Sequence, residues 1–292
     1  MICNQPWHYS PKFILNTIIR PCDRRLSSCT VVFMNNPIKA VLFDCDGTLA
    51  PVHMQVTPAV RDSVTKLSRL VPVAVISSRD FHDISWLAKD LGLTAPQISE
   101  GGARLFDAQT ARCLDLQCLE ISDAEDIFKL LDKQSLEFIA VDEDKRISAV
   151  DQIISWRISR ITATSLTEKQ ASEIMRDMNG HTLLHTAKVQ RTDNKEWMID
   201  FTHAQGNKLA AAGKFAGLLN LSVNDLVAAG DGYNDISMLT GCGYAVAMGQ
   251  SPKELHDVAD YVAPSVEEDG LAIAIEEFIL PKISNTTMLK TN

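Results

Sequence analysis

The sequence predicts an α/β fold in which a parallel sheet is interrupted by an inserted α+β domain. Short apolar runs alternate with amphipathic helical patterns from Ile38 to about residue 102, and the same alternation returns after residue 202. Strands and helices at such short spacings imply right-handed crossovers within one parallel sheet. Between these two stretches, hairpin and helix patterns replace the alternation, which is typical of a separate α+β domain.

The first stretch contains two strands, each followed by a helix. The strands are the apolar runs at residues 41–43 and 73–76. Thr57 and Pro58 open the first helix, as N-cap and first helical residue. The apolar stripe of this helix comprises Val60, Val64, Leu67 and Leu70. The stripe of the second helix, which Gly92 ends, comprises Ile84, Leu87 and Leu91.

The middle third has a different pattern. A turn at 107–110 separates two short apolar segments and predicts a hairpin. Ser122 and Glu125 have the spacing of a capping box and open one helix, while Thr167 and Gln170 open another in the same way. Helices interleaved with strands therefore predict an α+β domain in this region.

The parallel-sheet pattern then resumes. It comprises a helix at 207–219, a strand at 226–229, a short helix at 235–239, a strand at 244–247 and a closing helix at 270–280. The core is therefore discontinuous in sequence, because the α+β domain is inserted into it.

These patterns divide the chain into five parts: an N-terminal extension at 1–35, core segments at 36–105 and 202–284, the inserted domain at 106–201 and a tail at 285–292. The extension is rich in basic residues and poor in acids, as targeting peptides are, but its apolar patch is too short for a secretory signal. We therefore favour a disordered tail, or translation upstream of a true start at Met34, over a targeting peptide.

Composition limits the class of protein. The chain has 292 residues, of which 46% are hydrophobic and 22% charged, as in ordinary globular proteins. Its net charge of −9 argues against nucleic acid as a partner, since phosphate-backbone binding needs clustered Lys and Arg. No apolar run approaches the ~20 residues of a membrane span. The seven cysteines lack metal-ligand spacing and predict reduced thiols in a cytoplasmic protein.

Two acidic clusters follow predicted strands. Asp44 and Asp46 stand directly after the first strand, and Asp231 and Asp235 follow the first strand of the resumed pattern. Side chains at i and i+2 of an extended segment share a face, so Asp44 and Asp46 can act on one substrate. Ligands of open α/β sheets bind beyond the carboxyl ends of the strands. Because Mg²⁺ takes oxygen ligands, the two clusters predict a magnesium-dependent phosphoryl-transfer site.

The chain resembles the haloacid dehalogenase-like (HAD) phosphohydrolases through four motifs in order. These are Asp44-x-Asp46-Gly47-Thr48, Ser77, Lys208 and the segment at 230–235. The resemblance covers roughly residues 37–282. The spacing is similar to that of the Cof-like, sugar-phosphatase branch, in which a large cap domain lies between the second and third motifs. This resemblance implies a Rossmann-like core and identifies the inserted domain as the cap.

The first and third motifs supply the expected catalytic groups. A carboxylate at a strand end can attack phosphorus, so Asp44 is the expected nucleophile and would form an aspartyl phosphate. Asp46 is expected to protonate the leaving group and then to activate water. Lys208 falls in the first turn of a helix, an unfavourable place for a cation unless an anion lies opposite. The alternative for Lys208 is a solvated surface lysine.

The remaining motif residues are expected to hold the metal and the phosphoryl group. Asp231 should bind Mg²⁺ directly, together with Asp44, and Asp235 should bind or orient the ligand shell; its alternative role is the N-cap of the following helix. The resemblance adds a metal contact from the backbone carbonyl of Asp46. Ser77 or Ser78 is expected to contact a phosphate oxygen, and the pattern leaves open which serine serves. Asn234 is expected to hold a phosphate oxygen or to steady the loop.

Several other residues have two readings. Arg79 is either a substrate contact or an ion-pair partner. Cys45 faces away from the two aspartates on an extended strand, so a packed thiol is favoured over a nucleophile. His185 and His203 are expected to be structural or exposed. The basic residues of the cap that are candidates for choosing the substrate are Arg157, Arg160, Lys188 and Arg191.

The expected function is Mg²⁺-dependent hydrolysis of a small phosphomonoester, by resemblance a sugar phosphate or a phosphoglycolate-like acid. Two alternatives remain. A phosphosugar mutase on the same fold would need a basic cap pocket, whereas this cap has 12 Lys and Arg against 18 Asp and Glu. A non-catalytic sensor of phosphorylated metabolites would not need Asp44 and Asp46, and both are present. The sequence indicates no oligomeric state.

Overall fold

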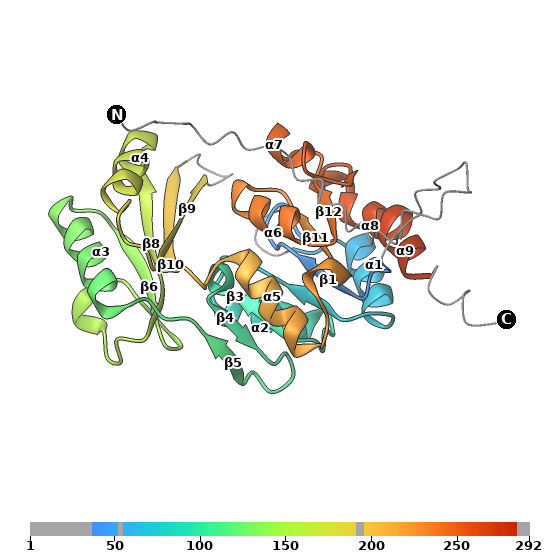
Figure 1. The fold of residues 1–292 in the computed structure, drawn as a ribbon, viewed down its shortest axis with the longest axis horizontal. Coiled ribbons are helices and arrows are strands. Elements are labelled where there is room, and N and C mark those ends of the chain that lie inside the picture. The colour runs from blue at the N-terminus through green and yellow to red at the C-terminus, as the bar shows by residue number, and fades with distance from the viewer. Residues whose placement is uncertain (1–36, 52–54, 191–195, 285–292) are drawn as a thin grey trace, which may run out of the picture. The chain divides into compact units, whose positions relative to one another are not determined.

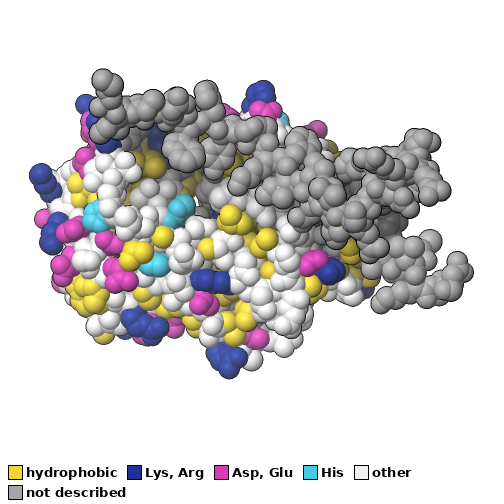
Figure 2. All heavy atoms as spheres, viewed as in Figure 1, with side chains coloured by type: hydrophobic (Ala, Val, Ile, Leu, Met, Phe, Trp, Pro, Cys, Tyr) yellow, Lys and Arg dark blue, Asp and Glu magenta, His cyan; other side chains and the backbone are white. Residues whose placement is uncertain are grey.

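A computed structural model describes residues 37–51, 55–190 and 196–284 of the chain. The predicted extension at 1–35, the tail at 285–292 and the cap residue Arg191 lie outside these described residues. Among the described residues, no helix is both long enough and apolar enough to cross a membrane. Acidic and basic side chains are interspersed on the face drawn in Figure 2, without a gathered basic patch on its described part.

A five-stranded parallel sheet forms the core, in the order β13-β12-β11-β1-β2. Figure 1 labels its strands β12, β11 and β1. Its strands are β1 (Ala40–Phe43), β2 (Val73–Val75), β11 (Leu226–Gly230), β12 (Tyr244–Ala247) and β13 (Tyr261–Val262). Strand β1 pairs with β2 on one side and with β11, almost 190 positions later in the sequence, on the other. The two separate core segments therefore build one sheet, and the predicted Rossmann-like parallel core is confirmed.

Helices cover both faces of this sheet because its strands are apolar on both sides. Val41 and Phe43 pack into one cluster with α1 (Pro58–Ser68) and α2 (Phe81–Asp90). The helical C-terminal segment adds to this cluster and comprises α8 (Gly270–Ala274), a π-helical turn (Ile275–Ile279) and α9 (Leu280–Ser284). The opposite face, with Leu42, packs on helices α5 (Lys208–Leu218), α6 (Ile236–Gly241) and α7 (Lys253–His256).

A second, antiparallel sheet forms the cap, in the order β7-β6-β8-β10-β9. Its strands are β6 (Phe138–Asp142), β7 (Lys145–Ile147), β8 (Ile158–Leu166), β9 (Leu184–Gln190) and β10 (Trp197–His203). Helices α3 (Ile121–Lys133) and α4 (Glu168–Asp177) bury their apolar stripes against one face of this sheet. The expected α+β cap is therefore present between the two core segments.

A three-stranded antiparallel sheet joins the core to the cap. It consists of β3 (Gln97–Ser99), β4 (Arg104–Phe106) and β5 (Cys113–Leu116), so the predicted hairpin is confirmed. Leu105 and Phe106 of β4 pack into the two clusters of the parallel sheet, and Leu119 is the first residue of the cap cluster. The exact limits of the cap, 106–201, stay a prediction.

Three local predictions were wrong. Helix α1 ends at Ser68, so Leu70 falls outside its apolar stripe and is 56% exposed. Strand β2 ends at Val75, one residue early, although Ile76 still donates its N–H to Phe43 O at 2.9 Å and forms an isolated bridge with Ile98. Helix α3 begins at Ile121, before Ser122, so that serine is not the N-cap. The capping box of Thr167 and Gln170, by contrast, is present.

Candidate active site

The carboxyl ends of the three adjacent strands β2, β1 and β11 meet at one edge of the sheet. Phe43, the last residue of β1, pairs with Val75 on one side and Ala229 on the other. The chain therefore carries Asp44 out of the sheet between Ser77 and Asp231, as the sequence pattern predicted. The backbone N–H of Asp44 donates to Ala229 O at 2.9 Å, which fixes the start of this loop.

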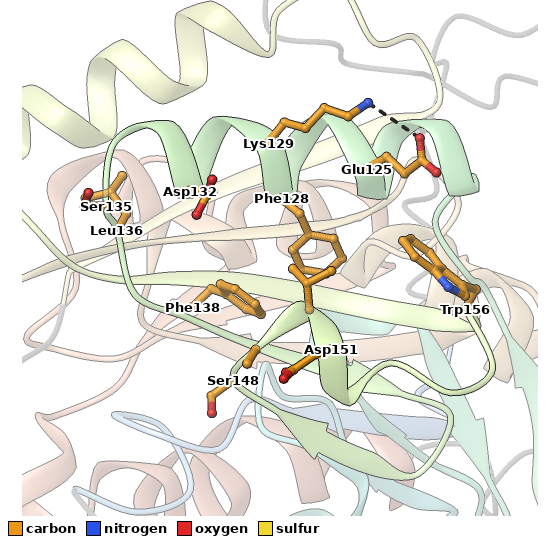
Figure 3. Close-up of a pocket in the computed structure, with 12 residues that line it drawn as sticks. Glu125, Phe128, Lys129, Asp132, Ser135, Leu136, Phe138, Ser148, Asp151 and Trp156 are labelled. Carbon is orange, nitrogen blue, oxygen red and sulfur yellow. Dashed lines mark ion pairs between the residues drawn. The ribbon is translucent and has the colours of Figure 1, made fainter.

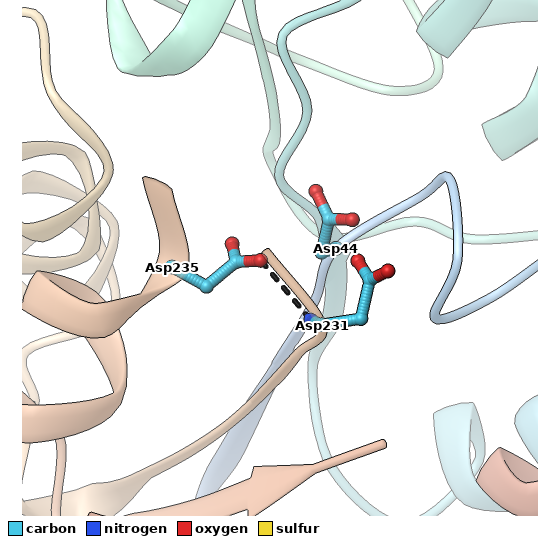
Figure 4. Close-up of side chains that lie close together, drawn as sticks. All are labelled: Asp44, Asp231 and Asp235. Carbon is cyan, nitrogen blue, oxygen red and sulfur yellow. Dashed lines mark hydrogen bonds between the residues drawn. The ribbon is translucent and has the colours of Figure 1, made fainter. Parts of the chain in front are cut away.

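Asp44, Asp231 and Asp235 form a carboxylate cluster (Figure 4), with one ligand atom of each within 4.8 Å of the others. Asp44 and Asp235 are buried. Oδ2 of Asp235 accepts the backbone N–H groups of Asp231 and Gly232, at 3.1 and 3.0 Å. Asp235 is at the N-cap position of α6 but makes no capping hydrogen bond with its side chain. Its carboxylate instead shapes the loop that presents Asp231.

Lys208 lies at the start of α5 and supplies the cation of this cluster. Its Nζ is 2.5 Å from Asp44 Oδ1 and 2.5 Å from Asp235 Oδ1, and its side chain is only 2% exposed. Burial disfavours the ammonium, but the two carboxylates outweigh burial and raise the lysine pKa. The alternative of a solvated surface lysine is therefore excluded for Lys208.

The cluster contains three carboxyl groups and one lysine, so its acidic groups outnumber its basic group. Burial, partly offset by Lys208, raises the pKa of Asp44 well above its ordinary value. Burial and then Asp235 raise the pKa of Asp231 to about 7. A Cβ placed on Gly47 would lie 2.1 Å from Asp231 Oδ2, so only glycine leaves room for this carboxylate. Three converging carboxylates, of which only Asp44 and Asp235 pair with Lys208, fit a divalent cation with oxygen ligands.

Asp46 lies beside this cluster but does not join it. Arg79 donates two hydrogen bonds to the Asp46 carboxylate, from Nε to Oδ2 at 2.7 Å and from Nη2 to Oδ1 at 2.8 Å. The hydrogen bonds to Asp46 raise the pKa of the arginine. The carboxylate of Asp46 is therefore not among the clustered ligand atoms, and the predicted metal contact of its backbone carbonyl stays a prediction. Arg79 is therefore an ion-pair partner, which is one of the two roles predicted for it.

We expect Lys208→Met to destabilise the metal-free protein by roughly 3 kcal/mol, because it leaves buried carboxylates without their cation. The measurement is urea unfolding in the presence of EDTA. Lys214→Met is the matched control on the same helix. Lys214 pairs with Asp115 at 2.7 Å, but both side chains are partly exposed, so its loss should cost at most about 1 kcal/mol. Equal losses in the two variants would contradict the buried role of Lys208.

A small cavity lies where the cap meets the carboxylate cluster. The core lines it with Ser78, Lys208 and Asn234, among others, and the cap lines it with His185, Ala187, Asp200 and Thr202. Its volume of about 20 Å³ suits a single water molecule. Ser77 Oγ accepts the N–H of Arg79 at 3.1 Å, and a hydroxyl that accepts one hydrogen bond can also donate one.

Sequence reasoning did not single out the cap side of this cavity. His185, expected to be structural or exposed, lines it, as do Asp200 and Thr202. Arg160 donates to the backbone oxygen of Ser78. A further residue at the cluster is Gln250, which donates from Nε2 to Gly47 O at 2.5 Å and approaches Asp231 Oδ2 at 3.5 Å.

Other candidates lie outside the cavity lining. Cys45 is fully buried and packs in the core, as expected. Burial, followed by the charges of Asp46 and Asp44, raises its thiol pKa and keeps it protonated. Arg157 pairs with Glu143 on the surface. Lys188 lies over the ring of Trp197, 4.1 Å from its centroid.

A wider hollow of about 820 Å³ lies elsewhere, between α3 and the turn after β7 (Figure 3). Phe128, Phe138 and Trp156 point into it, and Lys129 pairs with Glu125 at its edge. It contains none of the predicted site residues. Size alone would favour this hollow, but the converging charged groups favour the smaller cavity beside the carboxylate cluster.

Comparison with known proteins decides the family. A model of haloacid dehalogenase-like hydrolases matches residues 41–155 and 149–275. The chain belongs to the haloacid dehalogenase-like hydrolases. This HAD-like hydrolase is 25% identical over 252 residues to the 5-amino-6-(5-phospho-D-ribitylamino)uracil phosphatase YcsE of Bacillus subtilis, covering 83% of this chain and 96% of the relative.

Two further likenesses agree with this family. A phosphoglycolate phosphatase of Methanosarcina acetivorans is 26% identical over 243 residues, covering 82% of this chain and 95% of the relative. A solved HAD-like hydrolase from B. subtilis has the same fold, with a TM-score of 0.73 at 19% identity, covering 82% of this chain and all of the other. The predicted family, fold class and enzyme class, a HAD-like phosphatase, are confirmed.

Proposed function

We propose that this HAD-like phosphatase hydrolyses small phosphomonoesters with Mg²⁺ through an aspartyl phosphate on Asp44. The observation that carries this proposal is the position of Asp44. Its carboxylate leaves the central strand, contacts Lys208 at 2.5 Å and shares a buried cluster with Asp231 and Asp235. A buried carboxylate held by a cation at the carboxyl edge of the sheet suits a nucleophile better than a structural turn.

Asp44 and Asp231 would hold Mg²⁺ directly, because the hydrogen bonds of Asp235 to Lys208 and the loop occupy both of its oxygens. When bound, the ion supplies positive charge that neutralises the phosphoryl oxygens. Lys208 supplies further positive charge beside the Asp44 carboxylate. Ser77, Ser78 and Asn234 would position the phosphoryl oxygens by hydrogen bonds, in keeping with the positioning role that dominates phosphoryl transfer.

The reaction has two half-reactions. In the first, a carboxylate oxygen of Asp44 forms a bond to phosphorus, the bond from phosphorus to the leaving oxygen breaks, and protonated Asp46 gives that oxygen its proton. In the second, Asp46 takes a proton from water, whose oxygen attacks the same phosphorus. The bond between Asp44 and phosphorus then breaks and inorganic phosphate leaves. Asp46 must release Arg79, at least in part, to carry protons.

The cap would open and close over this site. The cavity of about 20 Å³ has room for a single water molecule, so a phosphorylated metabolite enters only if the cap moves away from the core. Closure then excludes water while the phosphoryl group is transferred. An enclosed site favours small metabolites over phosphoproteins, and the names of the two relatives, which refer to a ribityl phosphate and to phosphoglycolate, support this class. We also propose a cytoplasmic location, supported by the free cysteines among the described residues.

We expect Asp46→Asn to slow kcat by about 10²–10⁴-fold for an alkyl phosphate, because the leaving alkoxide then lacks a proton donor. The loss should be smaller for an aryl phosphate, whose leaving group needs little protonation. The rescue should be partial, since hydrolysis of the aspartyl phosphate still needs a base. The measurement compares kcat for both substrates in the parent and the variant. An equal fractional loss, with phosphoenzyme formation limiting both reactions, would contradict the proton-carrying role of Asp46.

A further inference from the structure

One face of the cap sheet is polar and buried, although the opposite face is an ordinary apolar core. On β8 and β10, apolar side chains such as Ile161 and Phe201 point to the helices, and polar ones occupy the positions between them. The pairing register aligns the polar positions across three strands. Thr162 lies opposite Asp200 and Arg160 opposite Thr202, which in turn lies opposite His185.

Most of this polar face is out of contact with solvent. Arg160, Thr162, Asp200 and Thr202 are each less than a tenth exposed. Burying polar groups costs free energy unless each one finds a partner. Thr202 Oγ1 is buried and has no hydrogen-bond partner in the described part of the chain. This polar face forms part of the wall of the cavity beside the carboxylate cluster. Its buried polar groups are therefore suited to contact the substrate.

The two carboxylate oxygens of Asp200 differ in their hydrogen bonds to the described residues. Thr162 Oγ1 donates to Asp200 Oδ1 at 2.6 Å, and Arg160 Nη1 lies 3.9 Å from the same oxygen. No donor among the described residues is hydrogen-bonded to Oδ2 of Asp200, whose side chain lines the cavity. The second oxygen of Asp200 can therefore accept a hydrogen bond from a bound molecule.

Among the cap residues that the structure describes, none of those lining the cavity is a lysine or an arginine. Its share of the lining consists of His185, Ala187, Asp200 and Thr202. Burial lowers the pKa of His185 and so favours its neutral ring. The guanidinium of Arg160 is directed to the backbone oxygen of Ser78 and is not part of the lining. On this described part of the cap, the portion of the substrate beyond the phosphoryl group therefore meets a carboxylate, a hydroxyl and an uncharged imidazole.

We propose that Asp200 is a specificity-determining residue that selects substrates with hydroxyl groups over substrates with a carboxylate. The free oxygen of Asp200 accepts a substrate O–H, and Thr202 Oγ1 adds a second hydrogen bond. A substrate carboxylate would instead face the like charge of Asp200 in a nearly dry cavity. The inference rests on the proposed function and narrows it to phosphorylated polyols and sugars. The phosphorylated ribityl chain in the name of one relative is of this class.

Two substrates with one carbon skeleton test this selection. Glycerol 3-phosphate and 3-phosphoglycerate differ only where the first has a CH₂OH group and the second a carboxylate. We expect the purified enzyme with Mg²⁺ to favour glycerol 3-phosphate by about 100-fold in kcat/KM, within the range that hydrogen-bonded sites achieve. Asp200→Asn keeps the shape and removes the charge, and it should reduce this ratio at least tenfold, to roughly 10 or less.

The control is Asp177→Asn, an exposed residue of α4, which should leave the ratio unchanged. If Asp200→Asn fails to fold, Thr202→Val tests the same surface and should also lower the ratio. An unchanged ratio in the folded variants, with both substrates losing activity equally, would show a merely structural role and overturn the inference. A parent enzyme that hydrolyses an aryl phosphate but favours 3-phosphoglycerate would overturn the inference alone. Hydrolysis of no phosphomonoester at all would overturn the proposed function with it.

Discussion

Replacing Asp44 with asparagine is expected to lower kcat by about 10⁴-fold or more, the scale of loss seen when a covalent nucleophile is removed. The amide keeps the volume of the carboxylate but is a poor nucleophile, so no acyl phosphate forms. The fold should survive, because Asp235 continues to pair with Lys208 at 2.5 Å. The measurement is kcat for an aryl phosphate, with circular dichroism and urea unfolding to check the fold.

Asp62→Asn is a suitable control for this experiment. Asp62 is exposed on α1 and belongs to none of the four motifs, so it should tolerate the same change without loss of activity. Activity of the Asp44 variant within tenfold of the parent would remove Asp44 from the role of nucleophile. The geometry of the cluster would then need another attacking group.

Removal of divalent metal is expected to have the second largest effect. Several kcal/mol of charge stabilisation are lost with the ion, which corresponds to about 10³-fold in rate. EDTA should therefore abolish the phosphatase activity, and Mg²⁺ should restore it. Ca²⁺ should restore it poorly, because it prefers six to eight ligands at longer distances. Full activity after exhaustive chelation would contradict the metal assignment.

A binding measurement separates metal binding from catalysis. Because the ion binds the folded state, Mg²⁺ should raise the unfolding temperature of the metal-free protein. Asp231→Asn should reduce this shift, since it removes a direct ligand from the cluster. Asp46→Asn should reduce it much less, because Arg79 holds the Asp46 carboxylate outside the cluster.

The core of the site could be predicted from sequence because it depends on strand ends. A parallel sheet brings the residues after its strands to one edge, so the sequence pattern alone predicts that Asp44, Ser77 and Asp231 lie together. Lys208 could also be predicted, because the first turn of a helix is an unfavourable place for a cation unless an anion lies opposite. Its partners Asp44 and Asp235 explain that position.

The rest of the site depends on tertiary contacts that the spacing of residues in the sequence does not predict. The orientation of Asp46 is set by Arg79, 33 positions later, and no local pattern shows that the two meet. The polar face of the cap sheet was equally hidden. Alternation on β8 and β10 predicts one polar face, but only the packing of the cap on the core decides whether that face meets water or the substrate. From the sequence alone, Asp200 would therefore be predicted to lie on the surface.

The most direct test of the account traps the phosphoryl group on the enzyme. The Asp46→Asn variant should form the aspartyl phosphate from an aryl phosphate and hydrolyse it slowly, so the intermediate accumulates. Acid quenching during the burst of phenolate release, followed by peptide mass spectrometry, locates the group. The account predicts the mass of one phosphoryl group on Asp44. A burst that leaves Asp44 unmodified, or that modifies another residue, would contradict the proposed mechanism.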